Sequence, residues 1–222
     1  MTYKNLYNYP NERMKITYPW IFWDNAFTIE EIDRMCAYFK EQGVDRGTTV
    51  GGSEIGPNGE MIVKQEPNEK VRKSNVKFHN YDPANENTKW IFERLNWTIS
   101  QANDQFYGFD LNGFDSFQYT EYDDTEQGRY DWHMDTIMGK DMPANMLETR
   151  KLSLTLCLNQ YGEDYEGGEF QVNVGNSDEP QTATALKGRA FLFPSFMIHR
   201  VAPVTKGTRK SLVVWCNGPK FK

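Results

Sequence analysis

The predicted fold of this chain is decided by the stretch Tyr130-Asp131-Trp132-His133-Met134-Asp135-Thr136. Side chains two residues apart on a β-strand share one face, so His133 and Asp135 can converge on a single point. An imidazole and a carboxylate presented together supply two of the three ligands of a metal site. Trp132 and Met134 face the opposite side and are expected in the core. The stretch therefore predicts a β-strand that carries part of a metal site.

The third ligand must come from a distant strand, and the chain holds only two other histidines, His79 and His199. His199 lies in Phe191-Leu192-Phe193-Pro194-Ser195-Phe196-Met197-Ile198-His199-Arg200-Val201, at the start of a predicted late strand. Two histidines and a carboxylate on one face of an octahedral metal leave three open positions, as in non-haem iron(II) oxygenases. Similar ligands also serve zinc hydrolases. For His79 we expect a surface position or a polar contact beside the site.

Arg209-Lys210-Ser211 follows His199 by ten residues. Arg209 and Ser211 share a strand face, so a guanidinium and a hydroxyl can bind one carboxylate together. A buried arginine is costly to leave unpaired, by about 3 to 5 kcal/mol if its partner is removed. A dicarboxylic co-substrate explains the pair and favours oxygenase chemistry. Trp215 falls on the same face and either packs beside the co-substrate or fills the core.

Short β-rich runs separated by turns follow one another after Asn112. They are Phe114 to Tyr122, Arg129 to Asp135, Lys151 to Asn159, Glu169 to Val174, Thr182 to Leu186, Arg189 to Phe193, His199 to Val204 and Ser211 to Cys216. Two helices are expected ahead of them. This order predicts an α+β, mostly β domain, a double-stranded β-helix or jelly roll with helices packed outside it.

The first helix is predicted from the capping box Thr28-Ile29-Glu30-Glu31 to about Gln42, with Gly43 as its stop. It buries Ile32, Met35, Cys36 and Phe39. The second runs from about Asn85 to Tyr107 and covers a sheet face with one apolar stripe. That stripe holds Trp90, Ile91, Leu95, Ile99, Ala102 and Phe106.

Two further strands are expected outside the C-terminal run. Trp20 to Trp23 is apolar and predicts a short buried strand. Val71 to Phe78 alternates apolar and polar residues and predicts another. On that strand, Arg72 and Ser74 face either the pocket mouth or solvent. Gly167-Gly168 predicts a turn.

We expect a single domain over residues 1–222, with an N-terminal arm at 1–19, a helical support and lid region at 20–112, and the jelly-roll core at 113–217. Gly47 to Gly59 is rich in glycine and predicts a loop or flexible hairpin, a candidate lid. Neither this segment nor the linker from Thr136 to Arg150 carries a motif. Residues that choose the substrate are expected on these two segments.

Composition excludes several classes of function. The formal net charge of -6 gives no electrostatic footprint for nucleic acid. No apolar run approaches the roughly 20 residues of a membrane span, so a soluble protein is expected. The three cysteines lack a C-x-x-C pair and predict reduced thiols in the cytoplasm. Cys157 and Cys216 lie in apolar runs and are expected in the core.

Four motifs carry a resemblance to a known family. They are Gln118 to Tyr122, Tyr130 to Asp135, Tyr165 to Phe170 and His199 to Ser211, with Trp215 beyond them. From Trp20 to Trp215 the chain resembles a 2-oxoglutarate and iron(II)-dependent oxygenase of the prolyl-4-hydroxylase-like group. The resemblance implies that His133, Asp135 and His199 bind iron and act in catalysis. It also implies a co-substrate site at Arg209, Ser211, Tyr122 and Trp215, with Arg209 on the distal carboxylate.

The chain departs from this group in one strand. Leu154 to Leu158 lacks the tyrosine that some relatives set near Arg209, so Ser211 or Tyr122 would take that role. Tyr122 falls where the family places a tyrosine that hydrogen-bonds the co-substrate. It is equally compatible with a core aromatic whose hydroxyl meets a backbone group.

The implied reaction consumes 2-oxoglutarate and O2, with ascorbate as a stimulant, and releases succinate and CO2 while an unactivated C–H bond is hydroxylated. A residue of a protein or peptide, proline first, is the expected substrate, and a free amino acid or other small molecule is the second possibility. We expect a monomer or weak dimer with no nucleic-acid or membrane partner. The alternatives to an oxygenase are a zinc hydrolase and an inactive metal-binding jelly-roll module. Neither of these two needs the pair Arg209 and Ser211.

Overall fold

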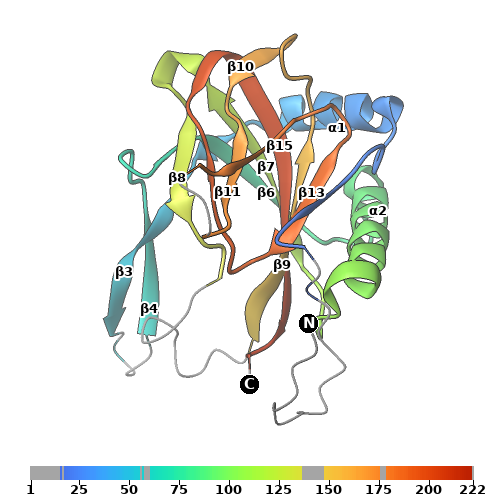
Figure 1. The fold of residues 1–222 in the computed structure, drawn as a ribbon, viewed down its shortest axis with the longest axis vertical. Helices are drawn as coiled ribbons and strands as arrows, with labels where there is room; N and C mark the ends of the chain where they lie inside the picture. Colours follow the sequence, from blue (N-terminus) through green and yellow to red (C-terminus); the bar gives the residue numbers. More distant parts are fainter. Residues whose placement is uncertain are drawn as a thin grey trace, which may run out of the picture.

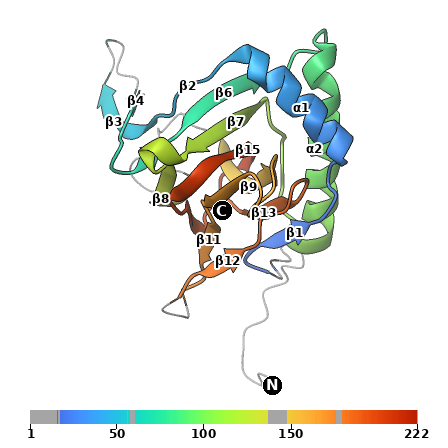
Figure 2. The same ribbon diagram turned by 90° about the horizontal axis from the view of Figure 1, so that it is seen from above.

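The structure is a computed structural model and describes residues 16, 18–55, 57, 61–136, 148–175 and 179–221. Two β-sheets enclose the centre of the molecule (Figure 1), and two helices lie against the outer face of the larger sheet (Figure 2). The predicted mostly β jelly roll with supporting helices is confirmed. Most of the predicted arm at 1–19 lies outside the described residues.

Helix α1 (Ile29–Gln42) begins at the predicted capping box. The hydroxyl of Thr28 accepts from the Glu31 backbone N–H at 3.2 Å, and the Glu31 carboxylate accepts from the Thr28 N–H at 2.8 Å. Gly43 ends the helix at a φ of 68°, a backbone conformation that glycine adopts without steric cost. The buried side chains are Ile32, Met35 and Phe39, while Cys36 is half-buried. The prediction for this helix is confirmed.

Helix α2 (Glu86–Ala102) is capped by Asn85 and continues as a π-helical turn, η1 (Asn103–Tyr107). Its buried face packs with α1 on the large sheet, in a core that includes Ile91, Leu95, Ile99, Ala102, Phe117, Leu154 and Leu192. The Tyr107 hydroxyl donates to the carbonyl of Leu192 at 2.9 Å and fixes the end of the helix to the sheet. The predicted end at Tyr107 is therefore confirmed.

The large sheet is antiparallel, has eight strands and follows the order β1-β13-β9-β15-β7-β6-β2, with β10 paired to β15. Its strands are β1 (Ile21–Trp23), β2 (Asp45–Arg46), β6 (Asn75–Asn80), β7 (Ser116–Asp123), β9 (Glu148–Cys157), β10 (Tyr165–Gly167), β13 (Ala190–Pro194) and β15 (Val204–Pro219). Strand β15 is 16 residues long and pairs with β7, β9 and β10. It forms the middle of the sheet.

The small sheet has five strands in the order β12-β11-β14-β8-β5. They are β5 (Arg72–Lys73), β8 (Arg129–His133), β11 (Phe170–Asn173), β12 (Gln181–Ala183) and β14 (Ile198–Val201). A short 3-10 helix, η2 (Asp124–Glu126), connects β7 of the large sheet to β8. Between the two sheets lies a second core of Cys157, Tyr165, Phe170, Val172, Ala183, Ala185, Phe191 and Phe193.

Strands β3 (Thr49–Ile55) and β4 (Met61–Glu66) form a separate two-stranded sheet. Of the loop or flexible hairpin predicted for Gly47 to Gly59, the structure has a hairpin that extends to Glu66, although residues 56 and 58–60 lie outside the described residues. Its function as a lid stays a prediction. Residues 137–147 of the linker from Thr136 to Arg150 also lie outside the described residues.

The single strand predicted from Val71 to Phe78 is wrong. The chain crosses between sheets at Ser74, so that β5 pairs with β8 in the small sheet and β6 pairs with β7 in the large one. The carbonyl of Ser74 accepts a hydrogen bond from the Gly47 N–H at 2.8 Å at this crossing. Side-chain alternation continues across such a crossing, so periodicity alone does not reveal it.

Further strand predictions need smaller corrections. Strand β10 was not predicted, and β15 begins at Val204, seven residues before the expected Ser211. Strand β1 is an edge strand rather than a buried one, and its Phe22 is 51% exposed. The three cysteines are free, with Cys157 and Cys216 buried as expected. Among the described residues, no helix has both the length and the apolar character needed to cross a membrane.

Candidate metal and co-substrate site

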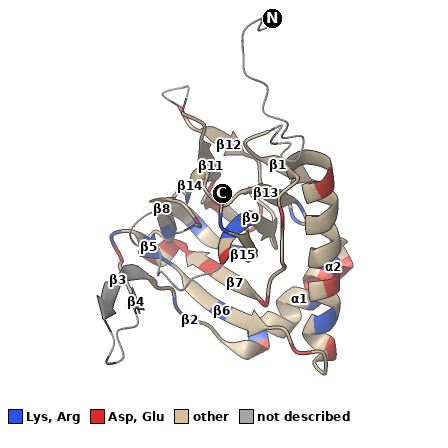
Figure 3. Cartoon of the chain, turned by 90° about the horizontal axis from the view of Figure 1, so that it is seen from below, with Lys and Arg blue, Asp and Glu red and all other residues tan. Residues whose placement is uncertain are grey.

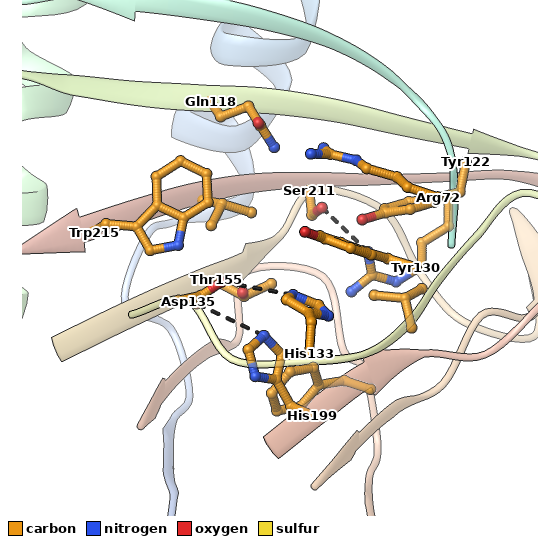
Figure 4. Close-up of a pocket in the computed structure, with 14 residues that line it drawn as sticks. Arg72, Gln118, Tyr122, Tyr130, His133, Asp135, Thr155, His199, Ser211 and Trp215 are labelled. Carbon is orange, nitrogen blue, oxygen red and sulfur yellow. Dashed lines mark hydrogen bonds and ion pairs between the residues drawn. The ribbon is translucent and has the colours of Figure 1, made fainter. Parts of the chain in front are cut away.

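The two predicted histidine ligands lie opposite each other on neighbouring strands of the small sheet. His133 ends β8 and faces His199 of β14, with ring centroids 4.2 Å apart. Asp135 lies two residues beyond β8, where its N–H and that of Thr136 both donate to the carbonyl of Ser195. The ligand atoms of the three side chains all lie within 4.8 Å of one another (Figure 4). The structure thus brings the predicted triad together.

Backbone carbonyls fix both imidazole rings. Nδ1 of His133 lies 2.7 Å from the carbonyl oxygen of Asp131, and Nδ1 of His199 lies 2.9 Å from that of Met197. A carbonyl only accepts, so each Nδ1 carries the proton and each Nε2 keeps its lone pair. Both Nε2 atoms lie 3.6 Å from a carboxylate oxygen of Asp135. Two imidazole lone pairs and a carboxylate therefore converge, as a metal ion requires.

The carboxylate of Asp135 is held from the large sheet. The Ser153 hydroxyl of β9 donates to Asp135 Oδ2 at 2.7 Å, and it lies 2.9 Å from the hydroxyl of Ser195. Arg150 Nη1 also donates to the Asp135 carbonyl at 3.4 Å. These contacts compensate for the position of Asp135 outside any strand, because they orient its side chain from neighbouring elements.

Burial and neighbouring charges set the protonation of the triad. Burial lowers the pKa of His199 to about 4, so this imidazole is neutral at pH 7. Burial favours a higher pKa for Asp135, but His199, His133 and the Ser153 hydroxyl together hold the pKa of this carboxyl well below its usual range. A neutral imidazole and an ionised carboxylate are the forms that bind metal ions. The donor set fits iron(II), with positions left open for other ligands.

Arg209 lines the same pocket as the triad and is only 1% exposed. Its Nη1 donates to the Ser211 hydroxyl at 3.1 Å. Its Nε and Nη2 are buried and have no hydrogen-bond partner among the described residues. An unsatisfied buried donor costs about 1 to 3 kcal/mol, and more when it is charged. A carboxylate that accepts from this guanidinium would remove that cost, so the residues present fit the distal end of 2-oxoglutarate.

Gly168 permits the close approach of Arg209. A Cβ at this position would lie 2.9 Å from Arg209 Cδ and 2.8 Å from a Val204 methyl carbon. Gly167 and Gly168 both have a positive φ, with Gly167 at the end of β10 and Gly168 in the connection to β11, so the turn predicted at this pair is not observed. Any other residue at Gly168 would press on the arginine side chain.

Tyr165 is a neighbour of Arg209 that sequence reasoning missed. Burial raises the pKa of Tyr165 to about 12, although the charge of Arg209 opposes this rise, so its hydroxyl stays neutral at pH 7. Cys157, opposite Ser211 in the β9 pairing, occupies the strand that lacks the family's tyrosine. A tyrosine near Arg209 is thus supplied by β10 instead. The only signal for it was its place in the motif from Tyr165 to Phe170.

Tyr122 and Trp215 both line the pocket, as predicted. Tyr122 is 4% exposed, and its ring centroid lies 5.5 Å from Arg209 Cζ. Trp215 has a buried Nε1 without a partner among the described residues, and Arg150 stacks over its ring at 4.1 Å. Contact of either residue with a co-substrate stays a prediction. Arg150 was not singled out in the sequence, because it lies at the end of a linker without a motif.

Three predictions about residues near the triad are wrong. Met134 is 43% exposed, and Trp132 is half-buried beneath Arg200 rather than in the core, because the small sheet shows its outer face to solvent. The strand ends at His133 instead of Asp135. His79 is neither at the surface nor beside the site, since it is 9% exposed and stacks on Phe117 in the helix-side core.

Comparison with known proteins finds a family that resembles the segment around this pocket. Residues 117–217 match the sequence model of the 2OG-Fe(II) oxygenase superfamily. This segment therefore resembles a 2-oxoglutarate and iron(II)-dependent oxygenase domain. It contains every predicted site residue, namely Tyr122, His133, Asp135, His199, Arg209, Ser211 and Trp215. The predicted cofactors, iron(II), 2-oxoglutarate and O2, are those that this superfamily uses.

The chain also resembles named hydroxylases. The chain is 33% identical over 91 residues to a PKHD-type hydroxylase of Alteromonas mediterranea, and the match covers 41% of this chain and 39% of that protein. The match thus spans about two fifths of the length of that curated relative.

Among solved structures, a prolyl-4-hydroxylase of Pseudomonas putida superposes with a TM-score of 0.65 at 16% identity, over 92% of this chain and 95% of that one. A prolyl hydroxylase of Trichoplax adhaerens, in complex with a hypoxia inducible factor peptide fragment, superposes with a TM-score of 0.64 at 17% identity. That superposition covers 90% of this chain and 84% of the other. These likenesses show that the fold is shared with prolyl hydroxylases.

Proposed function

We propose that the protein is a 2-oxoglutarate and iron(II)-dependent dioxygenase that hydroxylates an unactivated C–H bond and releases succinate and CO2. One observation carries the proposal. The triad of His133, Asp135 and His199 lines a single pocket with Arg209, a buried arginine that retains unpartnered donors. A metal site alone needs no such arginine, whereas a co-substrate with two carboxylates does.

Each residue has a distinct role in this proposal. His133, Asp135 and His199 would hold the iron(II), and Arg209 with Ser211 would hold the distal carboxylate of 2-oxoglutarate. Iron(II), 2-oxoglutarate and O2 together supply the oxidising power for C–H hydroxylation. The phenolic hydroxyl of Tyr122 would donate a hydrogen bond to the co-substrate. Trp215 would exclude water from the space beside the co-substrate.

The finer proposal concerns the substrate. A prolyl residue of a protein or peptide, hydroxylated as by prolyl 4-hydroxylases, is supported by the fold shared with proteins of that name. A free amino acid or other small molecule is the second candidate. The reducing cytoplasm as the site of action is supported by three free thiols. A monomer or weak dimer, and the division into regions 1–19, 20–112 and 113–217, complete the proposal.

Anaerobic addition of iron(II) and 2-oxoglutarate tests the proposal directly. A weak visible charge-transfer band is expected from the protein, and also from His79→Ala, which removes a buried histidine outside the triad. His133→Ala should abolish metal loading and the band. Zinc binding without any band from iron(II) and 2-oxoglutarate would instead favour a zinc hydrolase. Metal binding with neither band nor 2-oxoglutarate turnover would favour an inactive module.

Product formation tests the substrate. Candidate peptides and amino acids are incubated with the protein, iron(II), ascorbate and 2-oxoglutarate in air, and mass spectrometry is used to detect the gain of one oxygen atom. Oxygen added to a prolyl peptide would support the finer proposal. Oxygen added only to free amino acids would replace it with the second candidate.

A further inference from the structure

Arg72 is a second arginine that lines the pocket, and the chemistry proposed above gives it no task. It is 6% exposed and comes from β5, the strand that neighbours β8. Its Nε donates to the Ser74 hydroxyl at 2.7 Å, and its Nη1 donates to the carbonyl of Thr48 at 3.3 Å. Figure 4 shows it reaching past Tyr130 toward Gln118, on the side of the pocket away from His199. Of the two alternatives predicted for Arg72, the pocket mouth and a solvent-exposed strand face, the second is therefore wrong.

The surroundings of Arg72 hold it in one place. Its Cζ lies 4.8 Å from the ring centroid of Tyr130, which is a cation–π distance. A Cβ at Gly47 would lie 3.0 Å from Arg72 Nε and 2.5 Å from the Ser74 hydroxyl oxygen. The absence of a side chain at Gly47 therefore leaves room for the pair. An arginine constrained in this way offers a preorganised guanidinium to a ligand.

Arg150 adds a further positive charge beside the pocket. It is half-buried, stacks over Trp215 and donates to the Asp135 carbonyl. Arg150 therefore lies against two residues of the pocket, Trp215 and Asp135. Figure 3 shows basic segments on β5, at the left beside β8, and on β9, in the middle of the view.

The charges of the loaded pocket do not balance. Iron(II) and the 2-oxoglutarate dianion would cancel each other. Asp135 is the only acid among the described residues that line the pocket, and it offsets one of the two arginines that line it, Arg72 and Arg209. One positive charge remains among these lining groups, in a protein whose formal net charge is -6.

We propose that Arg72, assisted by Arg150, binds a carboxylate of the substrate that is hydroxylated. This inference rests on the proposed function, because it assigns the acid to the second substrate and leaves 2-oxoglutarate on Arg209. A planar guanidinium matches a carboxylate in two parallel hydrogen bonds. The carboxylate can belong to a small free acid or to an acidic side chain of a peptide, and the experiment below distinguishes the two.

The test compares acids with their neutral amides. The anaerobic protein with iron(II) and 2-oxoglutarate is titrated with common L-amino acids and with the corresponding amino-acid amides, and the visible band is followed. A third series uses proline-containing peptides that differ by glutamate or glutamine. After air is admitted, mass spectrometry detects added oxygen. Acids are expected to shift the band and gain oxygen where their amides do not, and a response confined to glutamate peptides would assign the carboxylate to a polypeptide.

Variants assign the effect to Arg72. Arg72→Gln should raise, at least tenfold, the concentration of the responding acid that is needed to shift the band. This change is equivalent to about 1.4 kcal/mol. The same variant should leave 2-oxoglutarate affinity unchanged, and Arg72→Lys should retain part of the response. Arg200→Gln is the matched control, because Arg200 also stacks on an aromatic ring of the small sheet but does not line the pocket. Thermal unfolding of each variant identifies any that fail to fold.

Two outcomes overturn the inference and leave the proposed function intact. One is a normal band that responds equally to acids and amides, or to neither, and this comparison needs no variant. The other is an Arg72→Gln protein that loses 2-oxoglutarate affinity as strongly as an Arg209 variant. By contrast, a protein that forms no band with iron(II) and 2-oxoglutarate removes the proposed function itself.

Discussion

Arg72 and Arg209 line one pocket and share a local pattern, since each is followed two residues later by a serine that accepts its hydrogen bond. The atoms involved differ. Ser74 accepts from Nε of Arg72, whereas Ser211 accepts from Nη1 of Arg209 and leaves Nε and Nη2 without partners among the described residues. The same arginine-x-serine pattern therefore presents the guanidinium in two ways.

The sheet around each arginine differs as well. Arg209 lies on β15, where it pairs with Tyr122 of β7 in the middle of the large sheet. Arg72 lies on the two-residue strand β5 at the edge of the small sheet. Edge strands and the connections near them tolerate change better than central strands do. A site on β15 suits an invariant co-substrate, and a site on β5 suits the substrate that distinguishes one oxygenase from another.

The largest expected difference between the two arginines is in 2-oxoglutarate binding. Arg209→Lys keeps the charge but removes the fork, so the Kd for 2-oxoglutarate should rise by about 30-fold or more, from a loss of at least about 2 kcal/mol. Iron(II) affinity should change little. Arg72→Lys should leave the Kd for 2-oxoglutarate unchanged. Calorimetric titration under anaerobic conditions measures both, and equal losses in the two variants would erase the distinction.

Substitution of alanine for Gly168, beside Arg209, and for Gly47, beside Arg72, should give a smaller difference in 2-oxoglutarate binding. At Gly168, with a φ of +65°, a Cβ meets Arg209 Cδ, and strain with overpacking should cost about 1 to 3 kcal/mol of unfolding free energy. Gly168→Ala should also weaken 2-oxoglutarate binding. Gly47→Ala should instead disturb Arg72 and Ser74 and spare 2-oxoglutarate. Denaturant unfolding and the titration above test this, and a Gly47→Ala protein with weakened 2-oxoglutarate binding would contradict it.

Removal of the serine hydroxyls should have a still smaller effect. Each hydrogen bond contributes about 1 kcal/mol, so Ser211→Ala should weaken 2-oxoglutarate about fivefold. Ser74→Ala should leave 2-oxoglutarate unaffected, because its partner is Arg72. The Kd for 2-oxoglutarate in the two variants is the measurement. If Ser74→Ala weakened it as much as Ser211→Ala, both arginines would serve the same ligand.

At neutral pH the smallest effect is expected from His79, which lies outside the pocket and touches neither arginine. Burial, followed by the charge of Lys77, lowers the pKa of His79 to about 4, whereas the unfolded chain binds this proton near pH 6.5. Between these values the unfolded state holds more protons, so the free energy of unfolding falls as pH falls. His79→Phe should flatten this fall and leave 2-oxoglutarate binding unchanged. If the free energy of unfolding fell equally in His79→Phe and in the unchanged protein between pH 6.5 and 4, the expectation would be contradicted.

The triad was predictable because its residue types are scarce. With three histidines in the chain, His133 and His199 could be chosen by their strand positions, and the spacing of Arg209 and Ser211 supplied an independent constraint. The capping box of α1 was equally local. Such features depend on contacts within a few residues, which sequence patterns record.

The features that escaped prediction depend on contacts between distant segments. The change of sheet at Ser74 follows from a hydrogen bond with Gly47, and no periodicity reveals it. Tyr165 reaches Arg209 only because β10 pairs with the start of β15. Asp135 is placed by Ser153 and Ser195 rather than by its own strand. In each case tertiary packing, and not local propensity, fixes the side chain.

The uninterrupted strand β15 has a consequence for the length of acid that the protein accepts. Arg209, Ser211, Val213 and Trp215 alternate along it and all line the pocket. Because β7 and β9 are hydrogen-bonded to either side of it, Arg209 cannot shift without moving the middle of the large sheet. Asp135 is tied to the same sheet through Ser153 of β9, so the large sheet holds both Arg209 and this member of the triad. In the proposed function, a 2-oxo diacid with one more methylene than 2-oxoglutarate would therefore have to fold or release one of its ends.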